Sequence, residues 1–219
     1  KAFASLIPAI IIAFLMILIN GCLAVFHTDL HGLLSKPFEF VKNLTGSWLG
    51  IIVIMLLIHL LWAVGVHGTA VIKNSFINPI LLVALTENID GATNIFAGDF
   101  VNMYIFIGGA GSTLGLVLLM LFRAKSQQLK VLGKAAILPG LFNINEPVIF
   151  GAPIVYNPYL IIPFIVTPLI NVTIAYFATS FGFVAKVITG IPWISPVGIG
   201  AFLGTGGDFR GILIAILIL

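Results

Sequence analysis

Long apolar runs without a charged residue constrain this chain more than any other feature of its sequence. Residues 3–19, 48–66 and 100–122 contain no Asp, Glu, Lys or Arg. Only 8% of the 219 residues are charged, whereas an ordinary soluble domain has about 25%. So few charges cannot cover the surface of a water-soluble globule, and the sequence therefore predicts an integral membrane protein.

The same apolar runs predict the helices. A transmembrane helix needs about 20 mostly apolar residues, and such helices are predicted over residues 3–19, 48–66, 100–122 and 159–184. Residues 27–47 mix charged and apolar side chains, which is typical of an amphipathic helix at the membrane interface. Residues 74–99 predict a short helix and then an acidic loop. The alternative is a further crossing within 74–99, which would invert the orientation of everything before it.

The predicted helices divide the chain into two parts. Residues 1–47 hold a transmembrane helix and the amphipathic linker helix, and residues 48–219 hold the candidate site described below. The apolar run at 211–219 is shorter than a full span of about 20 residues. The chain is therefore expected to be part of a longer protein.

Prolines break the regular pattern between residues 137 and 168. They stand at positions 139, 147, 153, 158, 163 and 168. A straight helix does not tolerate this density, because each proline removes a donor and clashes with the preceding turn. Irregular backbone at membrane depth persists only when it is buried in protein or lines a cavity. We therefore predict a re-entrant hairpin over 138–158, and a second broken element over 191–207.

Composition excludes several classes of function. A single cysteine, Cys22, rules out an internal disulfide and a cysteine-rich zinc site. The histidines have no metal-ligand spacing, so neither a metal nor a cofactor is expected. The glycines of 108–115 lie inside an apolar run, where close helix packing is expected rather than a dinucleotide loop. A basic cluster without interleaved aromatic residues indicates a cytoplasmic loop rather than nucleic-acid binding, and it consists of Arg123, Lys125, Lys130 and Lys134.

Glu146 is the strongest candidate for chemistry. It lies among apolar residues in the sequence FNINEPVIFGAP, which begins at Phe142. A carboxylate at membrane depth is costly and usually functional. Asn143 and Asn145 beside it both donate and accept hydrogen bonds, as sugar hydroxyls require. The alternative is that Glu146 braces a broken helix by accepting backbone N–H groups.

Trp62, His67 and Gly68 form a second candidate group, in the sequence WAVGVHG. An indole face packs on a pyranose ring, and a histidine binds a hydroxyl or exchanges a proton near neutral pH. Trp193, in the second broken element, is either a further sugar contact or an interfacial anchor. Asp208 and Arg210 predict an ion pair or a helix N-terminus. His59 is expected to be a packed or cavity-lining residue whose replacement changes little.

Two motifs together resemble a known family. The sequences FNINEPVIFGAPIVYNP and WAVGVHG are similar to the membrane-spanning IIC component of bacterial phosphotransferase-system sugar transporters, in the lactose, cellobiose and diacetylchitobiose branch. The resemblance implies an all-α multi-pass protein of the bacterial cytoplasmic membrane. In it, residues 48–219 would form a sugar-binding transport domain, and the helices that mostly build a homodimer interface would lie outside this chain.

The resemblance also implies a mechanism. A β-linked disaccharide enters from outside and is phosphorylated on a 6-hydroxyl by a cysteine of the separate IIB component, so Cys22 is not the donor. Glu146 and His67 would be the catalytic residues, and the sequence does not rank them as acceptors of the hydroxyl proton. The substrate-binding residues expected from the motifs are Trp62, His67, Gly68, Asn143, Asn145, Glu146 and Trp193.

Two other classes of protein compete with this interpretation. A proton-coupled secondary transporter would use Glu146 as its coupling acid and would not phosphorylate the sugar. A channel or structural membrane subunit would use none of these residues for chemistry. Neither alternative predicts which disaccharide is carried, and neither does the family motif.

Overall fold

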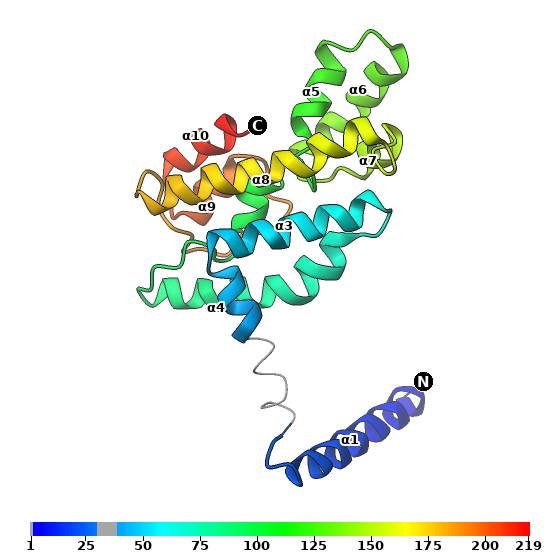
Figure 1. Ribbon diagram of the computed structural model, residues 1–219, viewed down its shortest axis with the longest axis vertical. Coiled ribbons are helices and arrows are strands. Elements are labelled where there is room, and N and C mark those ends of the chain that lie inside the picture. The colour runs from blue at the N-terminus through cyan, green and yellow to red at the C-terminus, as the bar shows by residue number, and fades with distance from the viewer. Residues whose placement is uncertain (1, 30–38) are drawn as a thin grey trace. The chain divides into compact units, whose positions relative to one another are not determined.

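The computed structural model describes residues 2–29 and 39–219, and within these ranges the chain is helical, without a strand (Figure 1). The expected all-α fold is confirmed. The chain divides into two units, residues 1–43 and 44–219, close to the expected boundary at 47.

The first unit contains one long helix, α1 (Ala2–Ala24). Its segment Leu6–Ala24 is long and apolar enough to cross a membrane, and its large side chains, from Leu6 to Ile19, are exposed. A helix with apolar side chains on all faces is suited to a lipid environment. Of the amphipathic helix expected over 27–47, residues 30–38 lie outside the described residues, and a short helix, Glu39–Thr45, follows them.

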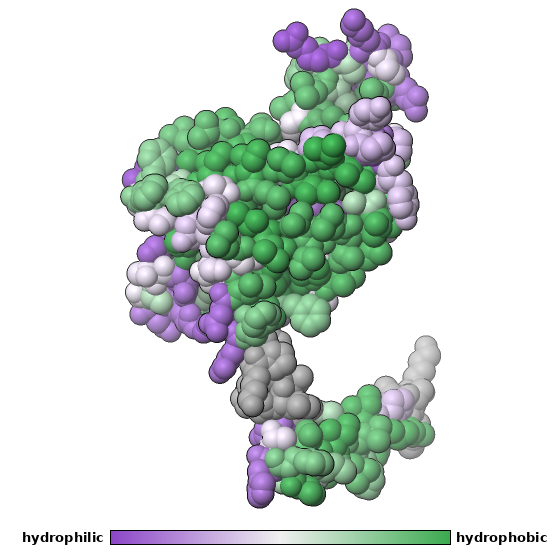
Figure 2. Space-filling view, in the orientation of Figure 1, coloured by the Kyte–Doolittle hydropathy of each residue, from purple (hydrophilic) through white to green (hydrophobic). Residues whose placement is uncertain are grey.

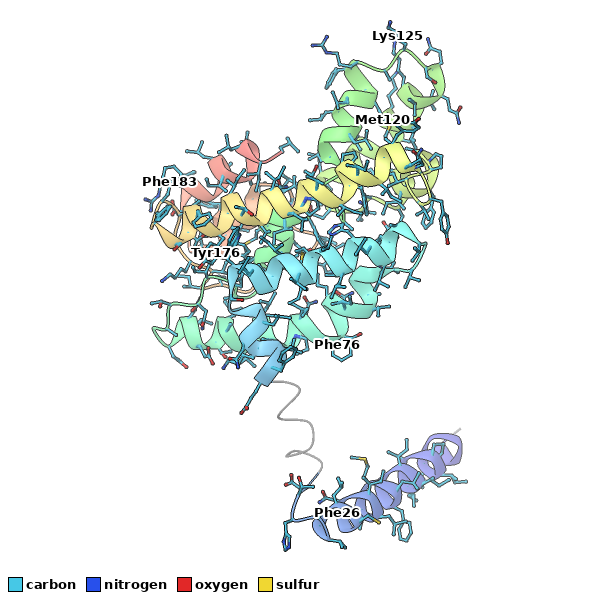
Figure 3. All side chains as sticks on the ribbon, in the orientation of Figure 1. Phe26, Phe76, Met120, Lys125, Tyr176 and Phe183 are labelled. Carbon is cyan, nitrogen blue, oxygen red and sulfur yellow. The ribbon has the colours of Figure 1, made fainter. Side chains whose placement is uncertain are left out.

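Two helices of the second unit lie side by side along much of their length (Figure 1). α3 (Trp48–Ala63) begins at Ser47, whose hydroxyl accepts from the backbone N–H of Gly50. α8 (Pro158–Ser180) continues through its internal prolines. The indole N–H of Trp48 donates to Thr173 Oγ1 at 3.2 Å, which joins the two helices. On α8, Tyr176 stacks on Phe96 with ring centroids 5.5 Å apart (Figure 3).

Residues 69–89 differ from the sequence expectation. They form a π-helix, η1 (Thr69–Ile77), continued by α4 (Asn78–Ile89). The combined stretch Thr69–Ile89 is long and apolar enough to cross a membrane. This helical stretch could therefore form the additional crossing that the sequence allowed as an alternative. The acidic loop is confined to the residues after Ile89.

The single span expected over 100–122 was wrong. A short π-helix, η2 (Val101–Ile105), is followed by irregular backbone over 106–113 and then by α5 (Leu114–Phe122). The physical reason is the glycine content of this stretch. Gly108, Gly109 and Gly111 have φ values of 76°, 96° and 80°, which a continuous right-handed helix excludes.

α5 and α6 (Gln127–Leu141) pack against each other as a hairpin. Lys125 lies at its tip, where hydrophilic side chains gather, whereas apolar side chains dominate the middle of the same face of the unit (Figures 2 and 3). Ser126 caps α6 by accepting from the N–H of Leu129. The basic cluster thus occupies the tip and the α6 side of this hairpin, and its cytoplasmic location stays a prediction.

The segment expected to be a re-entrant hairpin is broken rather than continuous. α6 ends at Leu141, four irregular residues follow, and α7 (Glu146–Gly151) begins at Glu146. Tight turns then lead to α8. The position of 138–158 relative to a bilayer stays a prediction.

The C-terminal part combines irregular backbone with two short helices. Residues 191–198 are irregular and contain Pro192 and Pro196; α9 (Ile199–Gly204) and α10 (Phe209–Leu217) follow. Asp208 caps α10 and also pairs with Arg210, with 2.9 Å between Oδ1 and Nε. Both expected roles of Asp208 are therefore present. The hydrogen bond from Arg210, with help from the N–H of Ala185, lowers the pKa of Asp208 to about 2.

Candidate functional site

A cavity of about 390 Å³ in the second unit brings together the candidate residues from both motifs. Its volume lies within the range of about 300–1,000 Å³ that is usual for small-molecule pockets. It is lined by Trp62, His67, Thr69, Lys73, Asn74, Asn78, Asn102, Phe106, Gly109, Ala110, Asn143, Asn145, Glu146 and Trp193.

A second cavity of comparable size, about 450 Å³, lies between residues 111–119 and α8. Its lining is mainly apolar and contains no ionisable side chain. The first cavity combines a carboxylate, an ammonium, an imidazole and several amides, so it is the candidate functional site.

Glu146 occupies the first turn of α7, and its side chain is exposed at the cavity. Within the described residues, no hydrogen bond or ion pair engages its carboxylate. Pro147 follows it at a position where the missing N–H has no helical partner to lose. Glu146 therefore does not brace the broken helix, which was the structural alternative, and its oxygens are free to bind a ligand.

Asn143 and Asn145 line the cavity but use their amides mainly to hold the backbone. Asn143 Oδ1 accepts from the N–H of Gly108 at 3.0 Å, and its Nδ2 donates to the carbonyl of Trp193 at 3.2 Å. Asn145 Nδ2 donates to the carbonyl of Ala110 at 2.6 Å and to Thr113 Oγ1 at 2.9 Å. These bonds join the break before α7 to the glycine loop, residues 106–113.

The glycine loop fits closely against these asparagines. At Gly109, φ is +96° and a Cβ atom would collide with the side chain of Asn145. The sequence analysis expected these glycines to serve close helix packing; instead they form a loop that packs on side chains. A side chain at position 109 would both strain the backbone and displace Asn145 from the cavity wall.

His59 supports the glycine loop from the opposite side. It is fully buried, its Nδ1 lies 2.6 Å from the carbonyl of Met55, and its Nε2 lies 3.0 Å from the N–H of Gly111. Since a carbonyl only accepts and an N–H only donates, His59 is neutral with its proton on Nδ1. It does not line the cavity. It is a packed residue, one of the two roles expected for it, and the expectation that replacing it changes sugar binding and phosphorylation little stays a prediction.

The turn after α3 brings Trp62 and His67 together. α3 ends at Ala63, and Gly65 reverses the chain with φ +83°. The two rings then lie 4.2 Å apart between centroids, and Trp62 Nε1 donates to Thr69 Oγ1 at 3.1 Å. Trp62 is only 4% exposed, whereas Trp193 is 55% exposed. Trp193 thus offers the larger open indole face to a ligand.

A backbone N–H group three residues further along the chain orients the ring of His67. The N–H of Ala70 donates to Nδ1 of His67 at 3.1 Å. The neutral ring must therefore carry its proton on Nε2, which makes Nε2 a donor. Gly68 beside it needs its small size, because a Cβ atom would collide with the carbonyl of Ile58.

Sequence reasoning missed the polar wall contributed by the two π-helices. Lys73, Asn74 and Asn78 come from the η1–α4 run, and Asn102 comes from η2. Asn78 Nδ2 donates to Asn74 Oδ1 at 3.2 Å, the i, i+4 contact of one helix face. A lysine and two asparagines within a run long enough to span a membrane were the available signal. The run was not recognised because 74–99 was divided into a short helix and a loop.

Comparison with known proteins decides the family. A family model described as "Phosphotransferase system, EIIC" matches residues 1–168. The chain belongs to this family.

Individual relatives agree with this assignment. The chain is 40% identical over 200 residues to the cellobiose-specific EIIC component of Geobacillus stearothermophilus, covering 87% of this chain and 44% of the relative. It is 39% identical over 223 residues to the lichenan permease IIC component of Bacillus subtilis, covering 96% and 48%. The crystal structure of ChbC, the IIC component from the N,N'-diacetylchitobiose-specific system, matches with a TM-score of 0.83 and 37% identity, over 99% of this chain and 52% of that one.

Membership confirms the resemblance to this family and the expected integral membrane location. A secondary transporter of another family is no longer favoured. This EIIC chain spans about half the length of the relatives it matches.

Proposed function

We propose that this EIIC chain contains the site where a β-linked disaccharide is bound, carried across the membrane and phosphorylated on a 6-hydroxyl. The observation that carries the proposal is the Glu146 carboxylate, which faces a cavity of about 390 Å³ and has no partner among the residues that the structure describes. The names of the relatives, which specify cellobiose, lichenan and N,N'-diacetylchitobiose, support a β-linked substrate.

The lining supports a sugar rather than a purely apolar ligand. Trp193 offers an exposed indole face for the apolar side of a pyranose ring. Asn74 and Asn78, from the η1–α4 run, supply amide donors and acceptors to the same lining. Hydroxyl groups both donate and accept, so amide groups pair with them well.

The chemical step is a phosphoryl transfer. The P–S bond of the IIB phosphocysteine breaks, an O–P bond forms at the sugar 6-hydroxyl, and the cysteine leaves as a thiolate. The hydroxyl proton passes to a residue of this chain. The positioning of the two reactants supplies much of the rate in such reactions.

Glu146 is the better candidate for the proton acceptor. Its oxygens have free lone pairs, whereas Nδ1 of His67 is occupied by the N–H of Ala70 and Nε2 carries the proton. His67 would instead donate Nε2–H to an oxygen of the sugar. In this arrangement the two residues, which the sequence left unranked, have different roles.

The experiment uses the full-length protein in membrane vesicles with purified IIB and the phosphoenolpyruvate-dependent donor enzymes. Labelled cellobiose should enter only when phosphoenolpyruvate is present, and it should be recovered as the phosphate ester. Uptake of unmodified sugar driven by a proton gradient would contradict the proposal and favour a secondary transporter. The homodimer expected from the resemblance stays a prediction, which cross-linking of the full-length protein would check.

A further inference from the structure

Lys73 is a buried cation on the wall of the candidate site. It lies in η1, is 3% exposed and lines the cavity that also contains Glu146 and His67. It belongs to the Thr69–Ile89 run, which is long and apolar enough to cross a membrane. A lysine in such a position is costly unless a partner offsets its charge, and it usually has a function.

The protein itself provides no direct partner for this ammonium group. No hydrogen bond or salt bridge joins Lys73 to any residue that the structure describes. Asp99 interacts with it only electrostatically, without a salt bridge between them. Asp99 Oδ1 instead accepts from Asn102 Nδ2 at 2.6 Å, and Asp99 Oδ2 has no hydrogen-bond partner. The donors of Lys73 are therefore available to a molecule in the cavity.

We propose that Lys73 binds the phosphoryl group that is transferred to the sugar, both during the transfer and afterwards in the sugar phosphate product. This inference rests on the proposed phosphorylation. A phosphoryl group brings about 1.5 to 2 negative charges at pH 7. It would enter a cavity whose lining already contains the Glu146 carboxylate. Lysine is a common point-charge partner for phosphate oxygens, and a cation fixed in place before the reaction favours the charge that develops there.

Lys73 is the one lysine or arginine among the described residues that line the cavity. His67 is the other titratable nitrogen there, and its ring is already oriented by Ala70. A neutral disaccharide gains little from a full positive charge, whereas its phosphate ester gains a direct ion pair. Lys73 therefore should discriminate between the two ligands, and this discrimination separates its role from that of a general sugar contact.

The test compares ester and sugar binding in the full-length protein. Purified wild type, Lys73→Met and Lys73→Arg are titrated with cellobiose and with cellobiose phosphorylated on a 6-hydroxyl. Lys73→Met should weaken binding of the ester about tenfold to hundredfold, because hydrogen bonds to charged groups are worth about 1.5–3 kcal/mol. It should weaken binding of cellobiose much less than binding of the ester. Lys73→Arg keeps the charge and should retain most of the ester affinity. Lys134→Met, on the exposed face of α6, removes a positive charge away from the cavity and is the matched control.

Three results would overturn the role of Lys73. These are unchanged ester binding in Lys73→Met, an equal loss for sugar and ester, and the same loss of ester affinity in Lys134→Met. Thermal melting in detergent shows whether each variant is folded. If Lys73→Met is unfolded, the affinity of Lys73→Arg for the ester tests the role of the charge at position 73. If the wild type with phosphorylated IIB makes no sugar phosphate, the proposed function fails. If the wild type makes it and Lys73→Met binds and forms it equally well, only the Lys73 inference fails.

Discussion

Two groups of polar side chains build the cavity and its support, and they differ in what their polar atoms bind. The frame consists of His59, Asn143 and Asn145, whose ring nitrogens or amides bind the glycine loop or the carbonyl of Trp193. The open group consists of His67, Lys73 and Glu146, each of which keeps a polar atom free for the cavity. In this protein, what a polar atom binds tells more than the residue type about whether a residue supports the structure or acts on a ligand.

The two groups should differ in how much their removal lowers the free energy of unfolding. Removing a frame residue leaves buried backbone groups without partners, at about 1–3 kcal/mol for each group. Among the described residues, removing Glu146 or Lys73 leaves no protein group unpaired, and removing His67 frees only the N–H of Ala70, at an exposed position. Frame variants should therefore lose stability, and open variants should lose function while they remain folded.

Glu146→Gln should have the largest effect on function. Glutamine keeps the size and an acceptor oxygen but cannot take the hydroxyl proton. Phosphorylation-coupled uptake should fall by about 100-fold or more, since general-base catalysis contributes roughly 10²–10⁴-fold. Sugar binding should be largely retained, and melting should be unchanged. A normal transport rate in this variant would remove Glu146 from the chemistry.

His59→Ala should have the largest effect on stability. It removes the side-chain bond to the carbonyl of Met55, leaves the N–H of Gly111 without its partner and opens a void beside Phe106 and Phe164. We expect a loss of about 3 kcal/mol in the free energy of unfolding. Thermal melting in detergent measures it, with His67→Ala as the matched control. Equal melting of the two variants would contradict the division into frame and open groups.

The sequence singled out Glu146 and His67 of the open group and Asn143 and Asn145 of the frame, but it missed Lys73 and the backbone contacts of the frame. Glu146 and His67 could be found because a charged or ionisable residue in an apolar run is rare and conspicuous. His59 and the loop contacts of Asn143 could not, because they depend on backbone groups 35 to 52 residues away. The helix α1 was predicted within a few residues from hydropathy alone. The break at 106–113 was missed because glycine is compatible both with helix packing and with left-handed backbone.

His67 variants should show a smaller effect that tests which nitrogen acts. His67→Ala removes the Nε2–H donor and should weaken sugar binding and phosphorylation by about tenfold or less, the value of one hydrogen bond. His67→Gln places an amide NH₂ near the position of Nε2 and should restore part of the loss. If His67→Gln is as poor as His67→Ala while Glu146→Gln is active, the histidine is the proton acceptor and the proposed roles are reversed.

Asp208 lies outside both groups and should show the smallest effect. Asp208→Ala removes the cap of α10 and the contact with the N–H of Ala185, and loss of a cap costs about 1 kcal/mol. Asp208→Asn keeps a capping oxygen and is the matched control. Because its pKa is lowered to about 2 in the folded protein, ionised Asp208 contributes stability that is fully present above the unfolded pKa of about 3.9 and is lost as the pH falls toward 2. The difference in melting temperature between wild type and Asp208→Asn should therefore be constant from pH 7 to pH 5 and should shrink below about pH 4. A difference as large at pH 2.5 as at pH 7 would contradict a stabilising contribution from the ionised carboxylate. A loss of uptake in Asp208→Asn at neutral pH without a change in melting would give Asp208 a part in transport instead of a capping role.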